Sequence, residues 1–405
     1  MTSRLYYEDA YLASFAATVV AHGEVGGRAA VALDRSAFYP EGGGQPADHG
    51  TIDGVAISDV QVVDAIVWHV LAHGEQLGAL PLGATVRGSL DWARRRDHMQ
   101  QHCGQHLLTA AFMASGGPPT SSFHLGDGEV TIDLATPQLP AEQVRAAEEL
   151  ANQVVWEDRP ISTRFLSAEE LAGVALRKPP TVSGPVRVVS VADFDHSACG
   201  GTHPRSTGGV GLVAVLGWSR QRGGTRVSFA CGGRALRELR RLGAAAGAAA
   251  AALSVGVDEL PAAAARAVTA QKTAAKELGQ AQAALDAAEA LRLYAAGEPS
   301  GAARLVRYAF AELSSERLRT VAQGIAAQPG GVALLGSGGA RASLVVACAP
   351  ESARDAQALL RVGLALLEGR GGGNALLAQG GGPQSAQLAA ALEAMLGAAR
   401  KAQNE

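Results

Sequence analysis

The chain has 405 residues, of which 47% are hydrophobic and 18% are charged, and its formal net charge is -3. This length is enough for about two to three domains with their own cores, and the composition excludes a disordered protein. The small net charge excludes the general attraction of a nucleic-acid coat protein, so any polyanion must be bound by local basic patches.

The cysteines lie far apart, at Cys103, Cys199, Cys231 and Cys348. This spacing differs from the dense framework of a disulfide-bonded secreted protein. The N-terminus carries charged residues where a signal peptide would need an apolar stretch of about 7 to 15 residues, so we expect a cytoplasmic protein. The uncharged run 242–257 is shorter than the roughly 20 residues needed to cross a bilayer, so we expect no membrane partner.

Residues 1–91 contain short apolar runs separated by Gly, Pro and Asp clusters, which indicates strands and turns. The runs are Ala29–Leu33, Val60–Val63, Ile66–Leu71 and Val86–Leu90. We predict a small β-barrel-like domain here.

Residues 92–232 begin with a helical pattern at Trp92 and then mix both periodicities. We predict a helix at Pro140–Val155 and strands at Glu129–Leu134, Val186–Val191 and Gly211–Leu216. This mixture predicts an α+β domain.

The remaining chain is divided into an Ala-rich part, 233–297, and a part at 298–405 in which strand and helix patterns alternate. The Ala-rich part is interrupted at Ser254–Pro261, which predicts a helical hairpin or coiled coil. The last part predicts an α/β domain, with its Gly clusters at 336–339, 371–373 and 380–382 in loops. The predicted fold class is therefore multidomain α+β.

The strongest chemical signal is the pair His102 and His106 on the predicted helix. Histidines four residues apart share a helix face and can hold one ion, although this spacing also occurs by chance. His98 extends the row, either as a ligand or as a polar neighbour. A zinc protease would have a general-base Glu after the first histidine, but this chain has Cys103, which we predict to lie in the core.

A second pair, Cys199 and His203, lies in a loop that contains two glycines. With the helical pair it offers three nitrogens and one sulfur, a complete tetrahedral set for zinc. Asp193 and Asp195, just before the cysteine, can accept a hydrogen bond from a ligating imidazole, but loop solvation is the simpler role.

These motifs resemble those of the free-standing alanyl-tRNA editing proteins (AlaX family, long form), which are similar to the editing domain of alanyl-tRNA synthetase. The matching segments are Phe38–Pro46, His102–Leu108, Ser121–Gly126, Ala198–His203 and Thr207–Gly208. The resemblance implies a zinc editing domain at residues 92–232, with one Zn2+ per chain bound by His102, His106, Cys199 and His203.

The resemblance also implies the reaction, which is hydrolysis of the ester that joins serine, or in some members glycine, to the acceptor end of tRNA(Ala). A synthetase pocket built for a methyl group rejects an added hydroxyl only about a hundredfold, so a second site must remove the error. With no class II catalytic core in the sequence, we expect no aminoacylation. One alternative is a non-catalytic tRNA-binding module with a structural zinc.

The segments 369–373 and 378–382 resemble the C-terminal extension shared by alanyl-tRNA synthetase and DHH-type phosphodiesterases, although Asn374–Leu377 departs from the usual signature. A phosphodiesterase is therefore a third hypothesis. It is disfavoured because the metal-binding catalytic domain that normally precedes this extension is not found in the sequence.

Several residues are candidates for contact with the substrate. Glycines at Gly42, Gly43 and Gly44 let the backbone approach it, although a plain turn is the alternative, and Gln45 is their polar partner. Ser122, His124 and Gln45 are the catalytic candidates, and Thr202 is a further binding candidate; on a strand edge Ser122 and His124 are more often ordinary surface residues.

Basic residues near both ends of the predicted editing domain are candidates for tRNA binding. They are Arg94, Arg95 and Arg96, and Arg234, Arg237, Arg240 and Arg241. Arginines on a helix can grip phosphates, but they more often form a solvated face. A homodimer through the helical hairpin or the C-terminal domain is left open.

Overall fold

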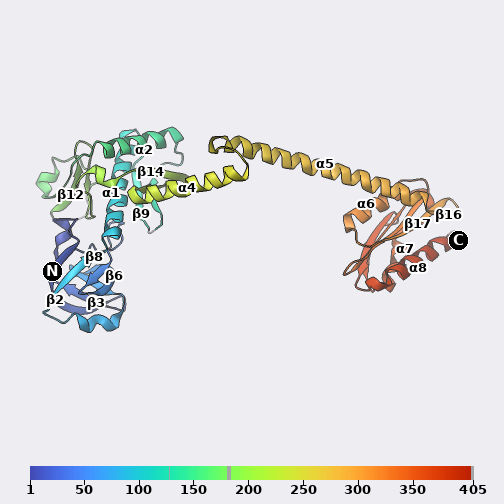
Figure 1. Ribbon diagram of the computed structural model, residues 1–405, viewed down its shortest axis with the longest axis horizontal. Coiled ribbons are helices and arrows are strands. Elements are labelled where there is room, and N and C mark those ends of the chain that lie inside the picture. Colours follow the sequence, from blue (N-terminus) through green and yellow to red (C-terminus); the bar gives the residue numbers. More distant parts are fainter. Residues whose placement is uncertain (127, 180–183, 403–405) are drawn as a thin grey trace. The chain divides into compact units, whose positions relative to one another are not determined.

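The computed structural model describes residues 1–126, 128–179 and 184–402, which divide into two compact units, Met1–Ala252 and Leu253–Glu405. The chain is multidomain and α+β, with several separate sheets (Figure 1), as the sequence predicts. Within these residues no single helix is long and apolar enough to span a membrane. The segments Gly232–Ala252 and Val257–Ala295 reach the necessary length and apolar composition only as a bent pair.

The N-terminal strands pair antiparallel and close into a small barrel. In barrel order they are β2 (Ser14–Val25), β3 (Arg28–Leu33), β7 (Ile66–Leu71), β6 (Val55–Val63), β5 (Gly50–Ile52) and β8 (Thr85–Leu90). A register shift between Ile57 and Asp59 lets both Ile57 and Val60 join the barrel core, although strict alternation would place them on opposite faces. Two short strands, β1 (Ser3–Arg4) and β4 (Arg35–Ser36), pair beside the barrel.

Helix α1 (Trp92–Ala114) follows the barrel directly, and the Asp91 carboxylate caps it by accepting a hydrogen bond from the backbone N–H of Arg94 at 3.1 Å. A four-stranded antiparallel sheet and helix α2 (Ala141–Trp156) pack against α1. The sheet order is β14 (Val213–Gln221), β15 (Gly224–Cys231), β10 (Val130–Leu134) and β9 (Thr120–Leu125).

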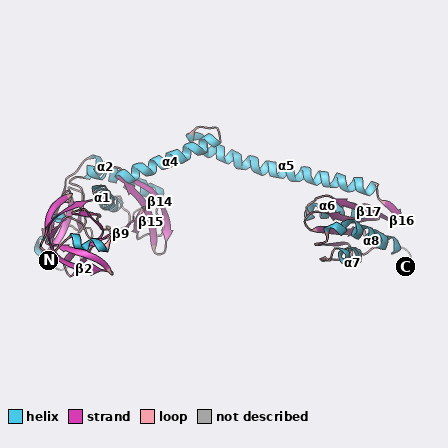
Figure 2. Ribbon diagram, turned by 60° about the horizontal axis from the view of Figure 1, so that its bottom comes forward, coloured by secondary structure: helices cyan, strands magenta, loops and turns pink. Residues whose placement is uncertain are grey.

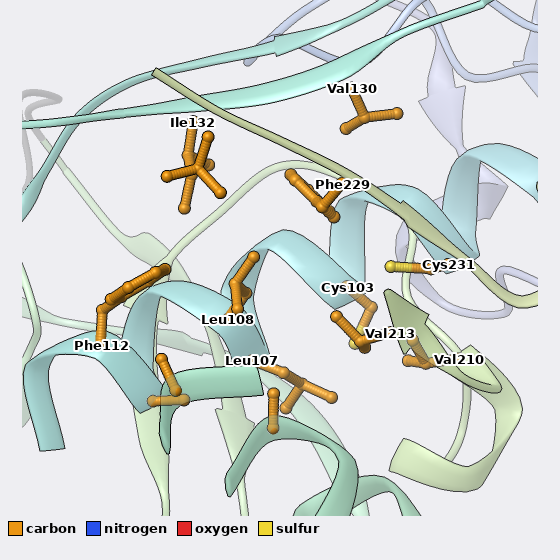
Figure 3. Packing of buried hydrophobic residues seen from close by; sticks show 14 of the residues in the cluster. Cys103, Leu107, Leu108, Phe112, Val130, Ile132, Val210, Val213, Phe229 and Cys231 are labelled. Carbon is orange, nitrogen blue, oxygen red and sulfur yellow. The ribbon is translucent and has the colours of Figure 1, made fainter. Parts of the chain in front are cut away.

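The core between α1 and this sheet is apolar (Figure 3). Cys103, Leu107 and Phe112 of α1 belong to one buried cluster with Ile132 of β10 and Phe229 of β15. Cys103 is fully buried in this cluster, as predicted. The helix therefore buries an apolar face here and leaves its other face to polar residues.

A three-stranded antiparallel sheet completes the N-terminal unit. It consists of β11 (Ile161–Leu166), β12 (Val186–Val191) and β13 (Asp195–Ala198), with the short helix α3 (Ala168–Leu171) after β11. Strand β13 ends immediately before Cys199, so this sheet delivers the second predicted ligand pair.

The Ala-rich region forms two helices, α4 (Gly232–Ala252) in the N-terminal unit and α5 (Leu260–Ala295) in the C-terminal unit. The interruption lies near the predicted position. Leu278 and Leu285 of α5 are 70% and 63% exposed in the single chain. A hairpin, a coiled coil or a dimer through these helices stays a prediction.

The C-terminal unit has a six-stranded sheet covered by helices (Figure 2). The strand order is β16 (Glu298–Ser300), β17 (Ala303–Phe310), β18 (Gly331–Ser337), β19 (Ala342–Cys348), β21 (Leu377–Gly382) and β20 (Arg370–Gly373). Along β18, Val332 and Leu334 pack with α7 (Ala356–Leu366) and α8 (Leu388–Lys401), whereas Ala333 and Leu335 pack with α5 and α6 (Ser315–Ala326). Burial on both faces explains the continuous apolar run in this strand.

Two predictions for this unit are wrong. The sheet is not that of an α/β domain, because only β17 and β18 run parallel and the other neighbours are antiparallel. The short link between β18 and β19 permits a hairpin but not a parallel crossover. The Gly clusters lie mainly in strands rather than loops, since Gly371 and Gly380 are cross-strand partners and a Cβ on either would come within 2.8 Å of the other's Cα.

Candidate metal and ester-binding site

Helix α1 presents His102 and His106 side by side, with their rings stacked at 5.2 Å between centroids. Both side chains are buried, because helix α2 and strands of both neighbouring sheets pack against α1. His102 and His106 therefore share one face of the helix, as the sequence predicted. His98 is also buried, but among the described residues it does not belong to the cluster of side chains that could bind a metal ion.

The loop after β13 brings Cys199 and His203 to the same place. Arg187 holds this loop, because its guanidinium donates hydrogen bonds to the carbonyls of Cys199 at 2.9 Å and Gly201 at 2.8 Å. The backbone N–H of Gly201 donates to the Cys199 sulfur at 3.3 Å. A Cβ on Gly201 would lie 2.6 Å from a ring carbon of His102, so the close approach of loop and helix requires glycine.

The ligand atoms of His102, His106, Cys199 and His203 all lie within 4.8 Å of one another. The Cys199 sulfur is 3.1 Å from Nε2 of His102 and 3.4 Å from Nε2 of His203. Nδ1 of His106 lies 3.5 Å from the Asp195 carboxylate, which leaves its Nε2 for the cluster. Three imidazoles and one thiol at these distances can hold a metal ion.

Burial prepares these side chains for metal binding. It lowers the pKa of His102 to about 4, with the charges of Arg187 and Arg177 acting in the same direction. It also holds the pKa values of His106 and His203 well below the ordinary range, so all three imidazoles are neutral at pH 7. Neutral imidazole is the form that binds a metal.

For the Cys199 thiol, burial opposes metal binding, because a metal binds the thiolate and burial favours the neutral thiol. Burial raises its pKa, while the N–H of Gly201 and the charge of Arg187 lower it. Of the two aspartates considered from the sequence, the structure places only Asp195 against a ligand, because Asp193 is exposed. A carboxylate behind a histidine fixes the orientation of the ring.

The glycine-rich turn packs directly on the metal cluster. Gln45 is fully buried; its side-chain amide donates to the Thr202 hydroxyl at 2.9 Å, and its carbonyl oxygen accepts from the Thr202 N–H at 3.1 Å. Gly44 has φ +81°, and a Cβ there would come 2.9 Å from the Phe123 ring, which itself lies against His102. Gln45 and Thr202 therefore join the turn to the ligand loop, and both are shielded from solvent.

A pocket of about 280 Å³ opens beside the cluster. Its lining includes Gln105 and Thr109 of α1, Thr120 and Ser122 of β9, and Arg177. Gln105 donates to the Thr109 hydroxyl at 2.9 Å, and that hydroxyl lies 2.9 Å from the Thr120 hydroxyl. Buried hydrogen-bonding groups thus form one side of a pocket next to the ligands.

The two strand candidates have different positions. Ser122 lines this pocket, and its hydroxyl donates to Asp133 at 2.5 Å. His124 is 60% exposed, does not line the pocket, and lies 3.7 Å from the same carboxylate. Arg226 also pairs with Asp133 at 2.7 Å and, with Ser122, lowers its pKa to about 2.

Sequence reasoning missed the pocket residues Gln105, Thr109 and Thr120. A signal was present, because Gln105 and Thr109 stand three and seven residues after His102 and so continue its helix face. For Thr120 the sequence offered no signal, since its position depends on how β9 pairs with β10.

The prediction that Arg95 binds tRNA is wrong. Its side chain is fully buried, forms an ion pair with Asp48 and donates to the carbonyls of Ala10 at 2.7 Å and Ala37 at 2.6 Å. It therefore joins α1 to the barrel and cannot reach a phosphate. Arg94 is partly buried and Arg96 is exposed.

Two family models match the chain. The model described as tRNA synthetases class II (A) matches residues 5–94, and the model described as threonyl and alanyl tRNA synthetase second additional domain matches residues 186–228. The second range contains Cys199 and His203.

Alanyl-tRNA editing protein Aarsd1 of Rattus norvegicus is 36% identical over 217 residues, which cover 52% of this chain and 51% of that protein. Alanyl-tRNA editing protein AlaX-L of Pyrococcus horikoshii is 33% identical over 251 residues, which cover 60% and 61%. The chain is similar to alanyl-tRNA editing proteins. The resemblance indicated by the motifs is thus confirmed.

An alanine–tRNA ligase of Pyrococcus abyssi is 37% identical over 252 residues, which cover 59% of this chain and 27% of the ligase. The match thus spans about a quarter of the ligase and between half and two thirds of the editing proteins. Among solved structures, the C-Ala domain of Aquifex aeolicus alanyl-tRNA synthetase is 26% identical, with a TM-score of 0.24 over 27% of this chain and 98% of that one.

Proposed function

We propose that this chain is a zinc-containing hydrolase that removes serine or glycine from mischarged tRNA(Ala). The observation that carries the proposal is the cluster of His102, His106, Cys199 and His203 beside a pocket with buried polar walls. The names of the relatives support tRNA(Ala) editing, and an ester at an acceptor end is the bond that editing must break. The four free cysteines support action in the reducing cytoplasm.

Zinc suits this donor set better than a hard cation, because thiolate and imidazole are its usual protein ligands. The four clustered side chains would hold it. When bound, it supplies a Lewis acid that polarises an oxygen or orients a substrate group. Asp195, 3.5 Å from Nδ1 of His106, would orient that ring, and Arg187 keeps the carbonyls of the ligand loop in place.

The pocket offers groups that would distinguish serine from the correct alanine. The hydroxyls of Thr109 and Thr120 and the amide of Gln105 can hydrogen-bond the seryl hydroxyl. A site built to bond a hydroxyl strongly rejects a substrate that lacks it, because its buried polar groups are then left unpaired. Serine should therefore be released faster than glycine, which also lacks the hydroxyl. Ser122 lines the same pocket and contacts the substrate, whereas Gln45 acts through Thr202 as a positioning residue.

A structural zinc in a tRNA-binding module without turnover is the alternative. The completeness of the donor set favours it, because four protein ligands close a zinc site and leave no position for water. The two hypotheses make the same prediction for zinc content and opposite predictions for hydrolysis.

The first experiment measures release of label from tRNA(Ala) charged with serine, glycine or alanine. Wild type should release serine and spare alanine, and His106→Ala should abolish release. His73→Ala removes an exposed histidine outside the site and is the matched control, with expected wild-type activity. No release from zinc-containing protein that binds the tRNA would eliminate the enzyme and leave the binding module.

The metal itself is tested by elemental analysis of purified protein. Wild type should hold about one zinc per chain. His102→Ala and Cys199→Ala should each lose it, whereas Cys348→Ala, which removes a buried thiol from the C-terminal unit, should retain it. Retention of stoichiometric zinc by both ligand variants would contradict the ligand set.

A further inference from the structure

A basic cleft of about 670 Å³ lies between the first turns of α1 and α4. Its wall contains four arginines, Arg94, Arg96, Arg234 and Arg237, and one acidic residue, Asp97. With histidine neutral, the cleft therefore carries a charge of +3, in a chain whose net charge is -3. Positive charge gathered in a cleft of an acidic protein attracts a polyanion.

The inner charges of the cleft are already paired. Arg234 grips both oxygens of Asp97 at 2.6 to 3.0 Å and donates to the carbonyl of Gly126 at 2.6 Å. Arg94 donates to the carbonyl of Ala47 at 3.0 Å. These contacts pair the single acid and tie both arginines to neighbouring segments.

The outer charges face solvent. Arg237 is 69% exposed and stays 3.9 Å from Asp97, and Arg96 is exposed with no ion-pair partner in the described parts of the chain. These two guanidiniums are therefore available to a ligand. The first turns of α1 and α4, each more than 20 residues long, add the positive ends of two helix dipoles.

Helix α1 carries both the cleft and two of the metal ligands. Arg94, His98 and His102 follow at intervals of four residues, so each is displaced by only about 40° around the helix from the last. The eight residues from Arg94 to His102 span about 12 Å along the axis. The cleft and the ligands are therefore close together along the helix.

We propose that this cleft binds the sugar–phosphate backbone of the RNA strand that leads to the acylated 3′ end. The assignment rests on the proposed function, because it is the ester at the metal site that brings this strand here. Arg96 and Arg237 contact backbone phosphates, for which the planar guanidinium is well suited. Trp92, which packs on Tyr11 at 5.5 Å between ring centroids, adds an aromatic wall against which a ribose or base can lie.

The test measures equilibrium binding of uncharged tRNA(Ala) to wild type and to the double variant Arg96→Gln/Arg237→Gln over a range of salt. Loss of two phosphate contacts should raise Kd by about tenfold and reduce the slope of log Kd against log salt by about two. Arg145→Gln/Arg222→Gln removes the same charge from exposed positions of the N-terminal unit outside the cleft and should leave Kd unchanged.

Hydrolysis of 2′(3′)-O-seryl-adenosine by wild type is measured in parallel, because this ester has no backbone to fill the cleft. Hydrolysis with equal tRNA affinity in wild type and the cleft variant would overturn the cleft and leave the proposed function standing. Absence of hydrolysis both of this ester and of tRNA(Ala) charged with serine, with the cleft variant still weakened for tRNA, would overturn the enzyme and leave the RNA site. Equal weakening by the control pair, or displacement of tRNA by poly-glutamate as effective as displacement by competing RNA, would also overturn the cleft as an RNA site.

Discussion

The interior of the N-terminal unit contains many polar side chains, whereas that of the C-terminal unit is almost entirely apolar. In the first, Arg95 is buried with Asp48, and Gln45 with Thr202, next to the four metal-type ligands. In the second, the buried polar side chains among the described residues are Asp286, Ser337 and Ser352. The difference indicates that the functional groups lie in the N-terminal unit. Buried polar groups stabilise a fold little by themselves, but they hold functional atoms in fixed positions.

The sequence supplies a way to follow each unit separately. All four tryptophans and all ten histidines precede residue 219, so both kinds of residue belong to the N-terminal unit. Tryptophan fluorescence therefore reports unfolding of that unit, whereas circular dichroism reports both.

The largest effect is expected from Arg95→Met, which leaves Asp48 charged, buried and unpaired. Removing one partner of a buried ion pair costs about 3–5 kcal/mol, so the fluorescence-detected free energy of unfolding should fall by this amount. Arg96→Met, at the exposed neighbouring position, is the control. Asp48→Leu with Arg95→Met should recover part of the loss but not all, because Asp48 also accepts from the N–H of Tyr39. A loss below about 1 kcal/mol would mean that the pair is not essential.

The matching test of the apolar interior is Leu344→Ala. Leu344 is fully buried in the C-terminal sheet, and truncation to alanine costs about 2–5 kcal/mol. Circular dichroism should show the loss, and tryptophan fluorescence should not. Leu376→Ala, at a position 48% exposed in the same unit, should change stability by less than about 0.5 kcal/mol. A shift of the fluorescence transition would show that the units do not unfold independently.

Acidification from pH 7 to pH 5 should destabilise the N-terminal unit, which contains all ten histidines. His69 is buried in the barrel between the Ser36 hydroxyl and the Val31 carbonyl, and burial lowers its pKa from 6.5 to about 4. Because the unfolded chain binds this proton more readily, the unit is fully stable above pH 6.5 and loses about 2 kcal/mol through His69 by pH 5.

Denaturant titrations between pH 7 and pH 5 measure this loss by fluorescence. His69→Gln keeps a polar group but cannot titrate, so its stability should depend less steeply on pH. An identical pH dependence of wild type and this variant would show that His69 is not the source.

The smallest effect is expected from a substitution at one glycine of the ligand loop. Gly201→Ala would press a methyl group against His102, and we expect metal affinity to fall by about tenfold, as when groups that orient ligands are disturbed. Gly200→Ala is a closely matched control, because its Cβ would lie 3.6 Å from the Tyr7 hydroxyl, an ordinary contact. Competition with a chelator measures both affinities, and equal values would show that the loop yields without moving the histidine.

Local patterns in the sequence predicted the apolar elements well. Strand β7 coincides with the predicted run Ile66–Leu71, and β12 coincides with Val186–Val191. The patterns did not predict β2 or β11, because β2 contains small and polar residues and β11 exposes four of its six residues. Strand β2 does bury Phe15, Ala17 and Val19 in the barrel core, but the small residues among them hide the alternation, and a strand as exposed as β11 is recognisable only from the partners with which it pairs.

The candidate site was predictable to a similar degree. Metal binding is indicated by two short patterns, which are histidines four residues apart on a helix and a Cys–His pair in a glycine loop. The four candidate ligands were therefore named from the sequence. The pocket wall of Gln105, Thr109 and Thr120 was not named, because hydroxyl and amide groups are common and only their burial beside the ligands distinguishes them.

By itself, the sequence determined the donor set, the order of most elements and the resemblance to the editing proteins, because these depend on residue type and on short spacings. Only the tertiary structure decided which of three consecutive arginines is buried, which of two aspartates lies against a ligand, and that arginines 140 residues apart share one cleft, as Arg94 and Arg234 do. Burial and proximity arise from packing between segments far apart in the chain, and no local pattern encodes them.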